Sequence, residues 1–339
     1  MFRVREIFEV KKISDLLHSL GLKTPENIEY TVGVYDGDKL IGTGSLVGNI
    51  LQGIGVDPCF QGEGVSALIV TNLLKKALEM GKEELFIFTK PEEAHHFQGM
   101  GFKKVAETSP FAVLLEWGKK GIEEYKAGLK KIAEPNPDGA SCIVMNGNPF
   151  TLGHRYLIEK AARESSWLYV LVVEEDRSLF PFHVRLELIK KGTSDLKKVT
   201  VIPSGKYVIS SLTFPSYFTR ETDLIRAQAS LDLEIFANHI APSLKVVKRY
   251  VGEEPYCPVT ACYNQLMKQI LIQYGIEVLE VERLKTHKQA VSASWVRELI
   301  REGRMEEIKE LVPSSTYEYL FSPEAQDIVE RIKMTQSRH

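Results

Sequence analysis

The sequence predicts an α/β protein with two domains, each built from alternating strands and helices. The chain has 339 residues, which is more than one average domain. Short apolar runs typical of buried strands alternate with longer segments in which apolar residues recur at helical spacing. Proline and glycine concentrate in residues 134–139, which predicts a linker. We therefore expect a first domain over residues 1–133 and a second over residues 140–339.

The first domain is expected to contain a hairpin near its start. Two strand-like runs, residues 27–35 and 39–46, flank the turn sequence Asp36-Gly37-Asp38. The same patterns continue along the domain. Further strands are expected at residues 50–56, 84–89 and 111–117, and helices at residues 65–81, 92–100 and 122–132.

The second domain repeats a strand–helix unit, which predicts a parallel sheet with right-handed crossovers. Strands are expected at residues 141–146, 167–173, 199–202, 231–237, 245–251 and 277–281. Helices are expected at residues 153–164, 182–191 and 259–274, with another opened by Ser292. Ligands bind at the carboxyl ends of the strands in such a sheet, so the site is expected at that edge.

The composition argues against several kinds of partner and compartment. A formal net charge of −2 gives no general attraction to nucleic acid or to an anionic membrane. No apolar run is long enough to span a bilayer, and no signal peptide is expected. The spacing of the four cysteines suggests neither a metal site nor a disulfide framework, which indicates a reducing cytoplasm.

The most informative segment is N-G-N-P-F-T-L-G-H, residues 146–154, which follows an apolar run and opens a helix. Free backbone N–H groups and the positive end of the helix dipole gather at such a turn, so it suits a phosphate. Thr151 and His154 add side-chain donors aimed the same way. The nucleotide-binding candidates in this turn are Asn148, Phe150 and Gly153.

A second helix start lies far along the chain, in V-S-A-S-W-V-R at residues 291–297. Ser292 and Ser294 are expected to cap this helix and leave N–H groups for an anion. Arg297 follows Ser294 by three residues, so it projects from the same face. Two such helix starts fit a triphosphate held between two halves of a sheet.

These segments resemble the H/T-x-G-H and I-S-S-T-x-x-R signatures of adenylyl-transferring nucleotidyltransferases, which have a Rossmann-like fold. More closely, residues 140–310 resemble the citrate lyase ligase family. Five blocks carry this resemblance, at residues 148–154, 180–185, 213–218, 252–255 and 292–297. The family also has an acetyltransferase-like first domain, so the resemblance covers nearly the whole chain.

That first domain resembles the GNAT fold. Q-G-E-G-V-S at residues 61–66 matches Q/R-x-x-G-x-G/A except for Ser66 at its end. In that pattern backbone amides hold a CoA pyrophosphate, which makes Gln61, Gly62 and Gly64 the binding candidates. Phe97 stands where the family pattern has a tyrosine, and it has no proton to give a departing thiolate. A scaffold role for this domain stays open.

The family resemblance implies a reaction. ATP, acetate and the deacetylated thiol form of citrate lyase give AMP, diphosphate and the acetylated lyase, with Mg²⁺ bridging phosphates. Acetate is ionised at neutral pH, so its attack on the α-phosphorus needs positioning and charge stabilisation rather than a base. His154 and Thr151 are expected to donate to the phosphates, Ser292 and Ser294 to act as helix-start donors, and Arg297 to reach the β/γ-phosphates. Because a threonine hydroxyl carries no charge, His154 is expected to contribute more than Thr151 to stabilising charge on the phosphates.

The partner implied by the resemblance is the acyl-carrier subunit of citrate lyase, whose thiol belongs to a CoA-like prosthetic group. A GNAT-like domain with a usable turn at residues 61–66 but Phe97 in place of tyrosine could hold that arm without transferring an acyl group. The base for the thiol step is not indicated by any motif.

For several other residues, two alternative roles stay open. Arg185 serves the site or a salt bridge; Glu253 and Glu254 bind Mg²⁺ or close a turn. The aromatic block at residues 213–218 either lines a pocket or packs in the core. His183 is expected on the surface. Lys206 and Arg220 are weaker candidates for binding phosphate. Two rival functions also stay open: a nucleotidyltransferase for a phosphorylated metabolite, and a non-catalytic acyl-CoA-sensing regulator.

Overall fold

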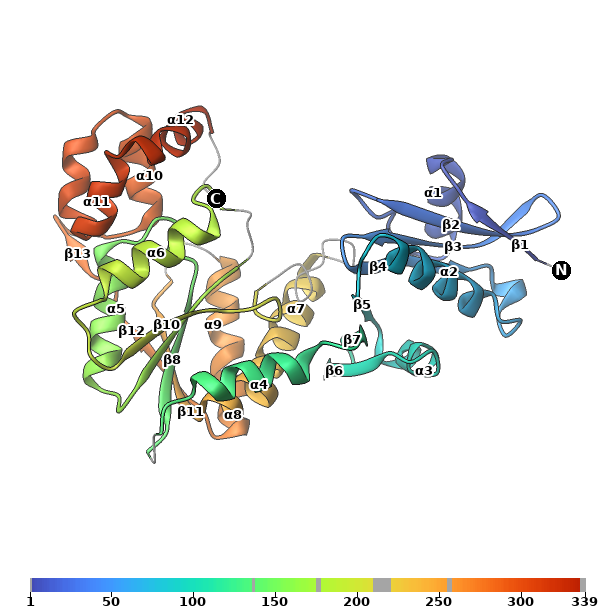
Figure 1. The fold of residues 1–339 in the computed structure, drawn as a ribbon, viewed down its shortest axis with the longest axis horizontal. Helices are drawn as coiled ribbons and strands as arrows, with labels where there is room; N and C mark the ends of the chain where they lie inside the picture. Colours follow the sequence, from blue (N-terminus) through green and yellow to red (C-terminus); the bar gives the residue numbers. More distant parts are fainter. Residues whose placement is uncertain (1, 136–137, 175–177, 210–220, 255–257, 336–339) are drawn as a thin grey trace. The chain divides into compact units, whose positions relative to one another are not determined.

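The structure is a computed structural model that describes residues 2–135, 138–174, 178–209, 221–254 and 258–335 (Figure 1). The chain divides into two compact units. The first comprises Met1–Tyr125 and Ser211–Ile235, and the second comprises Lys126–Ser210 and Phe236–His339. Each unit therefore draws on more than one stretch of the chain. The expected domain division at residues 134–139 stays a prediction.

The first unit contains a seven-stranded sheet. Its strand order is β1 (Arg3–Glu6), β2 (Tyr30–Asp36), β3 (Lys39–Val47), β4 (Ile50–Val56), β5 (Glu84–Thr89), β7 (Ala112–Gly118) and β6 (Lys103–Thr108). Neighbouring strands are antiparallel except β4 and β5, which run parallel and pair only through Ile50–Phe86 and Leu51–Ile87. The two halves of the sheet are thus joined by a very short ladder.

Helices cover this sheet. They are α1 (Val10–Ser19), α2 (Val65–Glu79), α3 (Ala94–Gln98) and α7 (Glu221–Ile235), with 3₁₀ turns at Pro58–Phe60 and Pro91–Glu93. Helix α2 packs on β2, β3 and β4 through Ile69, Leu73 and Ala77, which are all buried. Helix α7 packs on β6 and β7 although it lies far from them in the sequence. Helix α4 (Ile122–Ile132) runs across the division between the units.

The strand expected at residues 231–237 is wrong, because those residues lie in α7 and in a π-helical turn, Phe236–Ile240. The alternation of apolar and acidic residues suggested a half-buried strand. In the structure Leu231 and Leu233 are fully buried, and Asp232 between them is only 2% exposed. A helix buried on all sides leaves no periodicity that distinguishes it from a strand.

The second unit contains the parallel sheet that the repeats predicted. Its strand order is β10 (Val199–Pro203), β9 (Leu168–Val172), β8 (Ala140–Met145), β11 (Val246–Gly252) and β12 (Glu277–Val281). All four neighbouring pairs are parallel. The chain moves from β8 through β9 to β10 on one side and from β11 to β12 on the other. The order reverses between β8 and β11, and ligands collect at such a reversal.

The helices of the second unit enclose an apolar core. They are α5 (Leu152–Arg163), α6 (Phe182–Gly192), α8 (Ala241–Leu244), α9 (Pro258–Leu271), α10 (Ala293–Arg301), α11 (Ser314–Leu320) and α12 (Gln326–Met334). A short hairpin, β13 (Lys285–Thr286) and β14 (Gln289–Ala290), precedes α10, and 3₁₀ turns lie at Ile272–Tyr274, Met305–Glu310 and Pro323–Ala325. Ile158 of α5, Leu188 of α6 and Ile300 of α10 share one core with Val170 of β9. This core lies beneath the starts of α5 and α10.

The expected α/β class, with a parallel sheet in the second domain, is confirmed. Within the described residues, every helix is too short or too polar to span a bilayer. Cys59, Cys142 and Cys262 are free thiols.

Candidate active site

The turn between β8 and α5, residues 146–151, is here named the phosphate turn. Gly147 adopts φ +64°, a conformation that favours glycine, and a Cβ there would lie 2.9 Å from Ile189 Cδ1. Asn148 is 7% exposed, and its Oδ1 accepts a 3.0 Å hydrogen bond from the backbone N–H of Phe180. The amide of Asn148 therefore fastens the turn to the segment before α6. Its contact with the nucleotide stays a prediction.

Thr151 and His154 form a reciprocal cap at the start of α5. The His154 backbone N–H donates to Thr151 Oγ1 at 3.4 Å, and the Thr151 backbone N–H donates to His154 Nδ1 at 3.1 Å. Thr151 Oγ1 also lies 2.9 Å from Nδ1. Because Nδ1 accepts a backbone hydrogen bond, the neutral ring carries its proton on Nε2. The cap thus fixes both the orientation and the tautomer of the imidazole.

The imidazole of His154 is neutral at physiological pH. Burial, and secondly the Arg283 guanidinium, lower the pKa of His154 from 6.5 to about 4. Any stabilisation of phosphate charge by His154 would therefore come from its neutral Nε2–H group as a hydrogen-bond donor. Thr151 is only 1% exposed and its hydroxyl is engaged in the cap, so the geometry favours a positioning role for it over direct donation to a phosphate.

Phe150 lies behind the imidazole. Its side chain is fully buried, and its ring is stacked near-parallel to that of His154, with centroids 6.0 Å apart and an interplanar angle of 18°. A Cβ on Gly192 would lie 2.6 Å from Phe150 Cε1, so α6 approaches this ring closely. The position favours support of the His154 ring over contact with a nucleotide.

At the second helix start, only one of the two serines expected to cap α10 does so. Ser292 caps α10, and its Oγ accepts a 3.2 Å bond from the Trp295 backbone N–H. Ser294 is exposed, and its Oγ accepts a 3.3 Å bond from Arg297 Nη2. Arg297 is only 4% exposed, and its Nη1 donates to the backbone carbonyl of Asn148. Burial, and secondly Arg301, lower the pKa of Arg297 to about 10, which leaves it protonated at neutral pH.

The two helix starts converge. The bond from Arg297 to the Asn148 carbonyl joins α10 directly to the phosphate turn. In addition, a Cβ built on Gly153 would lie 2.7 Å from the Val291 backbone oxygen, closer than any real Cβ contact. Only glycine at position 153 lets the first turn of α5 approach the segment before α10. The first turn of α5 and the start of α10 therefore lie side by side.

Arg185 of α6 joins the segments that follow β8 and β9 through hydrogen bonds. It is fully buried; its Nε donates to the Phe180 carbonyl at 2.9 Å, and its Nη1 donates to the carbonyls of Asn146 at 3.0 Å and Val173 at 2.7 Å. Nη1 also donates to Asn146 Oδ1 at 2.7 Å. These bonds all go to carbonyl and amide oxygens, and a salt bridge to a neighbouring carboxylate stays a prediction. The guanidinium, with its several fixed donors, joins the ends of β8 and β9.

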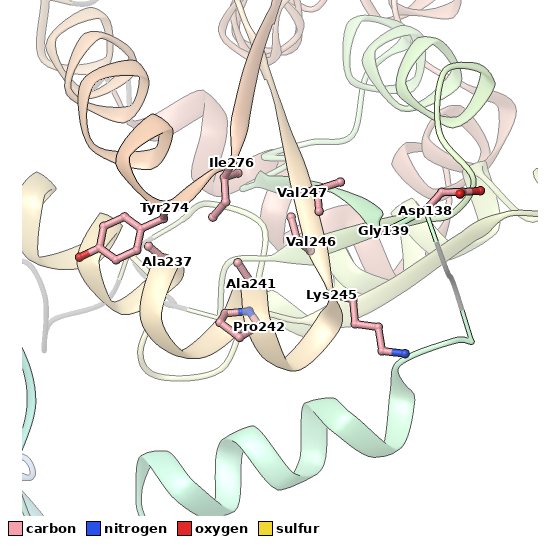
Figure 2. Close-up of a pocket in the computed structure, with 10 residues that line it drawn as sticks. All are labelled: Asp138, Gly139, Ala237, Ala241, Pro242, Lys245, Val246, Val247, Tyr274 and Ile276. Atoms are coloured by element: carbon pink, nitrogen blue, oxygen red, sulfur yellow. The ribbon is translucent and has the colours of Figure 1, made fainter.

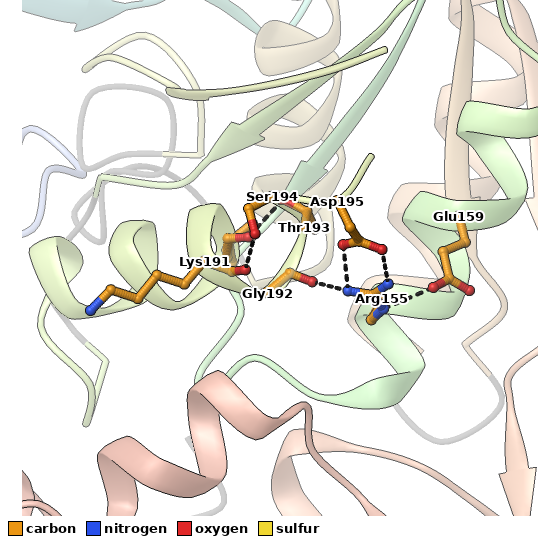
Figure 3. A network of polar contacts seen from close by, with 8 residues as sticks. Arg155, Glu159, Lys191, Gly192, Thr193, Ser194 and Asp195 are labelled. Carbon is orange, nitrogen blue, oxygen red and sulfur yellow. Dashed lines mark hydrogen bonds and ion pairs between the residues drawn. The ribbon is translucent and has the colours of Figure 1, made fainter. Parts of the chain in front are cut away.

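Arg155 fixes the other side of α5 (Figure 3). Its Nε donates to Glu159 at 2.8 Å, its Nη2 donates to Asp195 at 2.7 Å, and its Nη1 donates to the Gly192 carbonyl. These contacts tie the start of α5 to the segment that follows α6. Arg185 thus holds the phosphate turn, and Arg155 holds the helix that follows it.

Arg283 was missed by the sequence reasoning. It follows β12, and its Nη2 lies 2.5 Å from Glu254 Oε2, while its Nε donates to the Glu253 carbonyl at 2.6 Å. Glu254 therefore lies at the carboxyl end of β11 and Arg283 at the carboxyl end of β12. Arg283 is also close enough to His154 to lower the pKa of the imidazole. The signal available was position alone, since a residue after a parallel strand lies at the ligand-binding edge.

The remaining candidates have different outcomes. Metal binding by Glu253 or Glu254 stays a prediction; among the described residues no cluster of three or more His, Cys, Asp or Glu side chains could hold a metal ion. His183 is exposed, as expected. Lys206 follows β10 and lies 5.4 Å from the centroid of the Tyr207 ring. The aromatic block at residues 213–218 and Arg220 lie outside the described residues.

The first unit presents a different helix start. Gln61, Gly62 and Gly64 are exposed, and Gly64 precedes α2 with φ +78° and no side-chain cap. Gly62 adopts φ +84°. Phe97 is buried and packs edge-on against Phe102, with ring centroids 6.3 Å apart. The binding role of this glycine turn stays a prediction.

A pocket of about 420 Å³ lies elsewhere in the second unit (Figure 2). Its lining includes Gly139, Val246 and Ile276, which stand at the amino ends of β8, β11 and β12. It therefore opens at the edge opposite the phosphate turn and is not part of the candidate site.

Comparison with known proteins finds similarities to a family model, to other sequences and to solved structures. A family model described as the citrate lyase ligase C-terminal domain matches residues 140–320. A phosphopantetheine adenylyltransferase from Nautilia profundicola is 30% identical over 112 residues, covering 29% of this chain and 73% of its own length. Among solved structures, a GNAT-family acetyltransferase from Staphylococcus aureus MU50 is 13% identical, with a TM-score of 0.31, covering 35% of this chain and 100% of its own.

Two relatives match nearly the whole chain. The [citrate [pro-3S]-lyase] ligase of Klebsiella pneumoniae is 42% identical over 287 residues, covering 83% of this chain and 84% of the relative. The protein of the same name from Escherichia coli (strain K12) is 38% identical over 318 residues, covering 92% and 90%. These identities extend over both units and agree with the family model, so the chain belongs to the citrate lyase ligase family.

Proposed function

We propose that this chain acetylates the thiol of citrate lyase at the expense of ATP, through acetyl-adenylate, and so activates that enzyme. Acetate and ATP give acetyl-adenylate and diphosphate; the thiol then takes the acetyl group and releases AMP. The observation that carries the proposal is the convergence of two capped helix starts, those of α5 and α10, in a member of this family. A thiol substrate places the reaction in a reducing compartment, the cytoplasm.

The arrangement suits the first step. The carboxylate of acetate is already a nucleophile at neutral pH, so the protein must hold it in line and stabilise charge on the phosphates. His154 Nε2–H, the N–H groups at the start of α5 and those at the start of α10 would donate to phosphate oxygens. Arg297 adds a cation that is already oriented by Asn148 and Ser294. Thr151 would hold the imidazole in place.

The close approach at Gly153 supports binding of a polyphosphate, because it brings the donors of both helix starts to one place. Mg²⁺ would supply charge neutralisation by bridging phosphate oxygens. The described residues offer no ready-made carboxylate cage, which agrees with a metal held mainly by the nucleotide.

The first unit would hold the CoA-like arm of the acyl-carrier subunit of citrate lyase. The exposed glycine turn before α2 offers backbone donors for a pyrophosphate. Phe97 has no ionisable proton, so acyl transfer by this unit is not part of the proposal. A truncation of residues 1–133 would not test this cleanly, because α7 packs on β6 and β7 and would lose them.

Acetate-dependent exchange of labelled diphosphate into ATP tests the first step. We expect exchange with ATP, Mg²⁺ and acetate alone, and AMP release only when deacetylated citrate lyase is added. The similarity to an adenylyltransferase favours one rival, transfer of AMP to a phosphorylated metabolite. Exchange that ignores acetate but requires 4′-phosphopantetheine would establish the rival and exclude the proposal.

A further inference from the structure

One carboxylate at the ligand-binding edge has no role in the first step. Glu174 directly follows Val173 at the end of β9. The Val173 N–H donates to the Met145 carbonyl at 3.0 Å, and the Val173 carbonyl accepts a 2.7 Å bond from Arg185 Nη1. The same nitrogen holds Asn146 at the start of the phosphate turn. Glu174 therefore directly follows Val173, whose carbonyl is joined to the phosphate turn by the guanidinium of Arg185.

The surroundings of this carboxylate are unusual. Glu174 is half-buried, and its backbone N–H donates to Ser204 Oγ at 3.3 Å, which holds it beside the end of β10. Within the described ranges, no hydrogen bond or ion pair to its carboxylate is found. Burial raises the pKa of Glu174, and Lys206, the cation that acts on it, lowers it in part. A carboxylate kept half-buried without donors, at a ligand-binding edge, is typical of a functional group.

The second step of the proposed function needs such a group. The attacking species is a thiolate, and a free thiol has a pKa of about 8.5, so only a small fraction is ionised at neutral pH. Two other titratable groups at this edge are engaged, and the side chain of Glu253 is exposed rather than half-buried. His154 Nδ1 accepts from the Thr151 backbone, and Glu254 is paired with Arg283.

We propose that Glu174 is the general base of the thiol step, an inference that rests on the proposed function. Glu174 takes the proton from the S–H group as sulfur attacks the acetyl carbonyl carbon. A C–S bond forms, the bond between that carbon and the phosphate oxygen breaks, and AMP leaves with the bonding pair. The protonated Glu174 then returns its proton to water. Acetyl-adenylate formation makes no use of this residue.

The test uses the full-length Glu174→Gln variant, which keeps the size of the side chain and removes the base. Acetate-dependent diphosphate exchange should stay within about threefold of the parent. Single-turnover transfer from acetyl-adenylate to deacetylated citrate lyase should fall about 10²–10⁴-fold, the range for loss of a general base. The control is Glu187→Gln, an exposed residue of α6 paired with Lys191, and both rates should match the parent.

Two further readouts separate a base from a structural role. In the parent, transfer should decline at low pH as Glu174 gains a proton, with a midpoint above the ordinary pKa of glutamate; in Glu174→Gln this decline should vanish. The melting temperature of Glu174→Gln should equal or exceed that of the parent, because burial disfavours the charged form that the substitution removes.

Unchanged transfer in Glu174→Gln would overturn the inference. An equal loss of exchange and transfer would overturn it too, since Glu174 would then serve the nucleotide site. Failure of the parent to show acetate-dependent exchange would instead refute the proposed function. Transfer from chemically prepared acetyl-adenylate would still report on Glu174 in that case.

Discussion

The glycine-containing helix starts of α2 and α5 are built in opposite ways. Before α2, Gly64 is exposed, has no side-chain cap, and a Cβ added there would touch nothing within 4 Å. Before α5, Thr151 is buried and capped reciprocally by His154, and a Cβ on Gly153 would strike a backbone oxygen. Both offer N–H groups to an anion, but only the second is held rigidly from several sides.

Under the proposed function, the difference would correspond to two tasks. Phosphoryl chemistry gains from donors that are already oriented, because no reorganisation is then needed as charge develops. Arg185, Arg155 and Arg297 supply that rigidity around α5 through bonds to backbone carbonyls and to the neighbouring helix. A turn that holds a long, mobile arm needs donors but not a fixed reacting geometry. The comparison can be tested by substitutions on each side.

The largest expected effect is that of Arg185→Met. It would leave the carbonyls of Asn146, Val173 and Phe180 without their buried donor, at a cost of about 3–5 kcal/mol in the free energy of unfolding. Urea unfolding measures this. Arg304→Met is the control, because Arg304 pairs with Glu302 and Glu307 on the surface and its loss should change the free energy of unfolding far less. Equal effects would show that Arg185 does not brace the site.

His154→Ala should lower acetate-dependent diphosphate exchange about 10²–10³-fold, the usual effect of removing one oriented donor. His183→Ala serves as the control, because His183 is exposed on α6 and its loss should leave exchange unchanged. Exchange at the parent rate in His154→Ala would contradict a role for the start of α5 in phosphoryl chemistry.

A matched pair of glycine variants sharpens the comparison. Gly153→Ala would push α5 away from the Val291 carbonyl, and a displacement of about 1 Å can lower exchange roughly 10²-fold. Gly64→Ala meets no neighbour and costs only the strain of its positive φ, about 1–2 kcal/mol. It should spare exchange and weaken transfer to the lyase. The reverse pattern in the two assays would contradict the division of tasks.

The smallest effect concerns pH. The pKa of His154 is lowered from 6.5 to about 4, so the unfolded chain binds its proton at a higher pH than the folded chain does. The contribution of His154 to stability is therefore complete above pH 6.5 and declines as the pH falls toward 4. Nuclear magnetic resonance titration of the imidazole should show a midpoint near 4. A midpoint near 6.5 would mean that the ring is not held as described.

Local pattern was enough to predict much of the fold and part of the site. The strands at β4, β5 and β12 follow directly from short apolar runs with clear turns at each end. The caps at Thr151 and Ser292 were also predictable, because capping is a local interaction between a side chain and the next turn. Their convergence follows from the parallel sheet, which brings strand ends to one edge.

The missed features depend on long-range packing. Nothing in the sequence shows that residues 227–233 of α7 are all buried, so the apolar residues there suggested a strand. Arg185 bonds mainly to backbone carbonyls, and carbonyls leave no trace in residue identity. Arg283 meets Glu254 only after two parallel strands are placed side by side. Each of these contacts joins segments whose proximity the local pattern does not encode.

The placement of α7 has a consequence for biosynthesis. Residues Ser211–Ile235 complete the first unit, but the chain between Tyr125 and Ser211 belongs to the second. During translation, domains usually fold in order as they leave the ribosome, at roughly 5–20 residues per second. Here β6 and β7 must wait for α7 until about two-thirds of the 339 residues have been made. The N-terminal unit therefore matures late, alongside the unit that follows it.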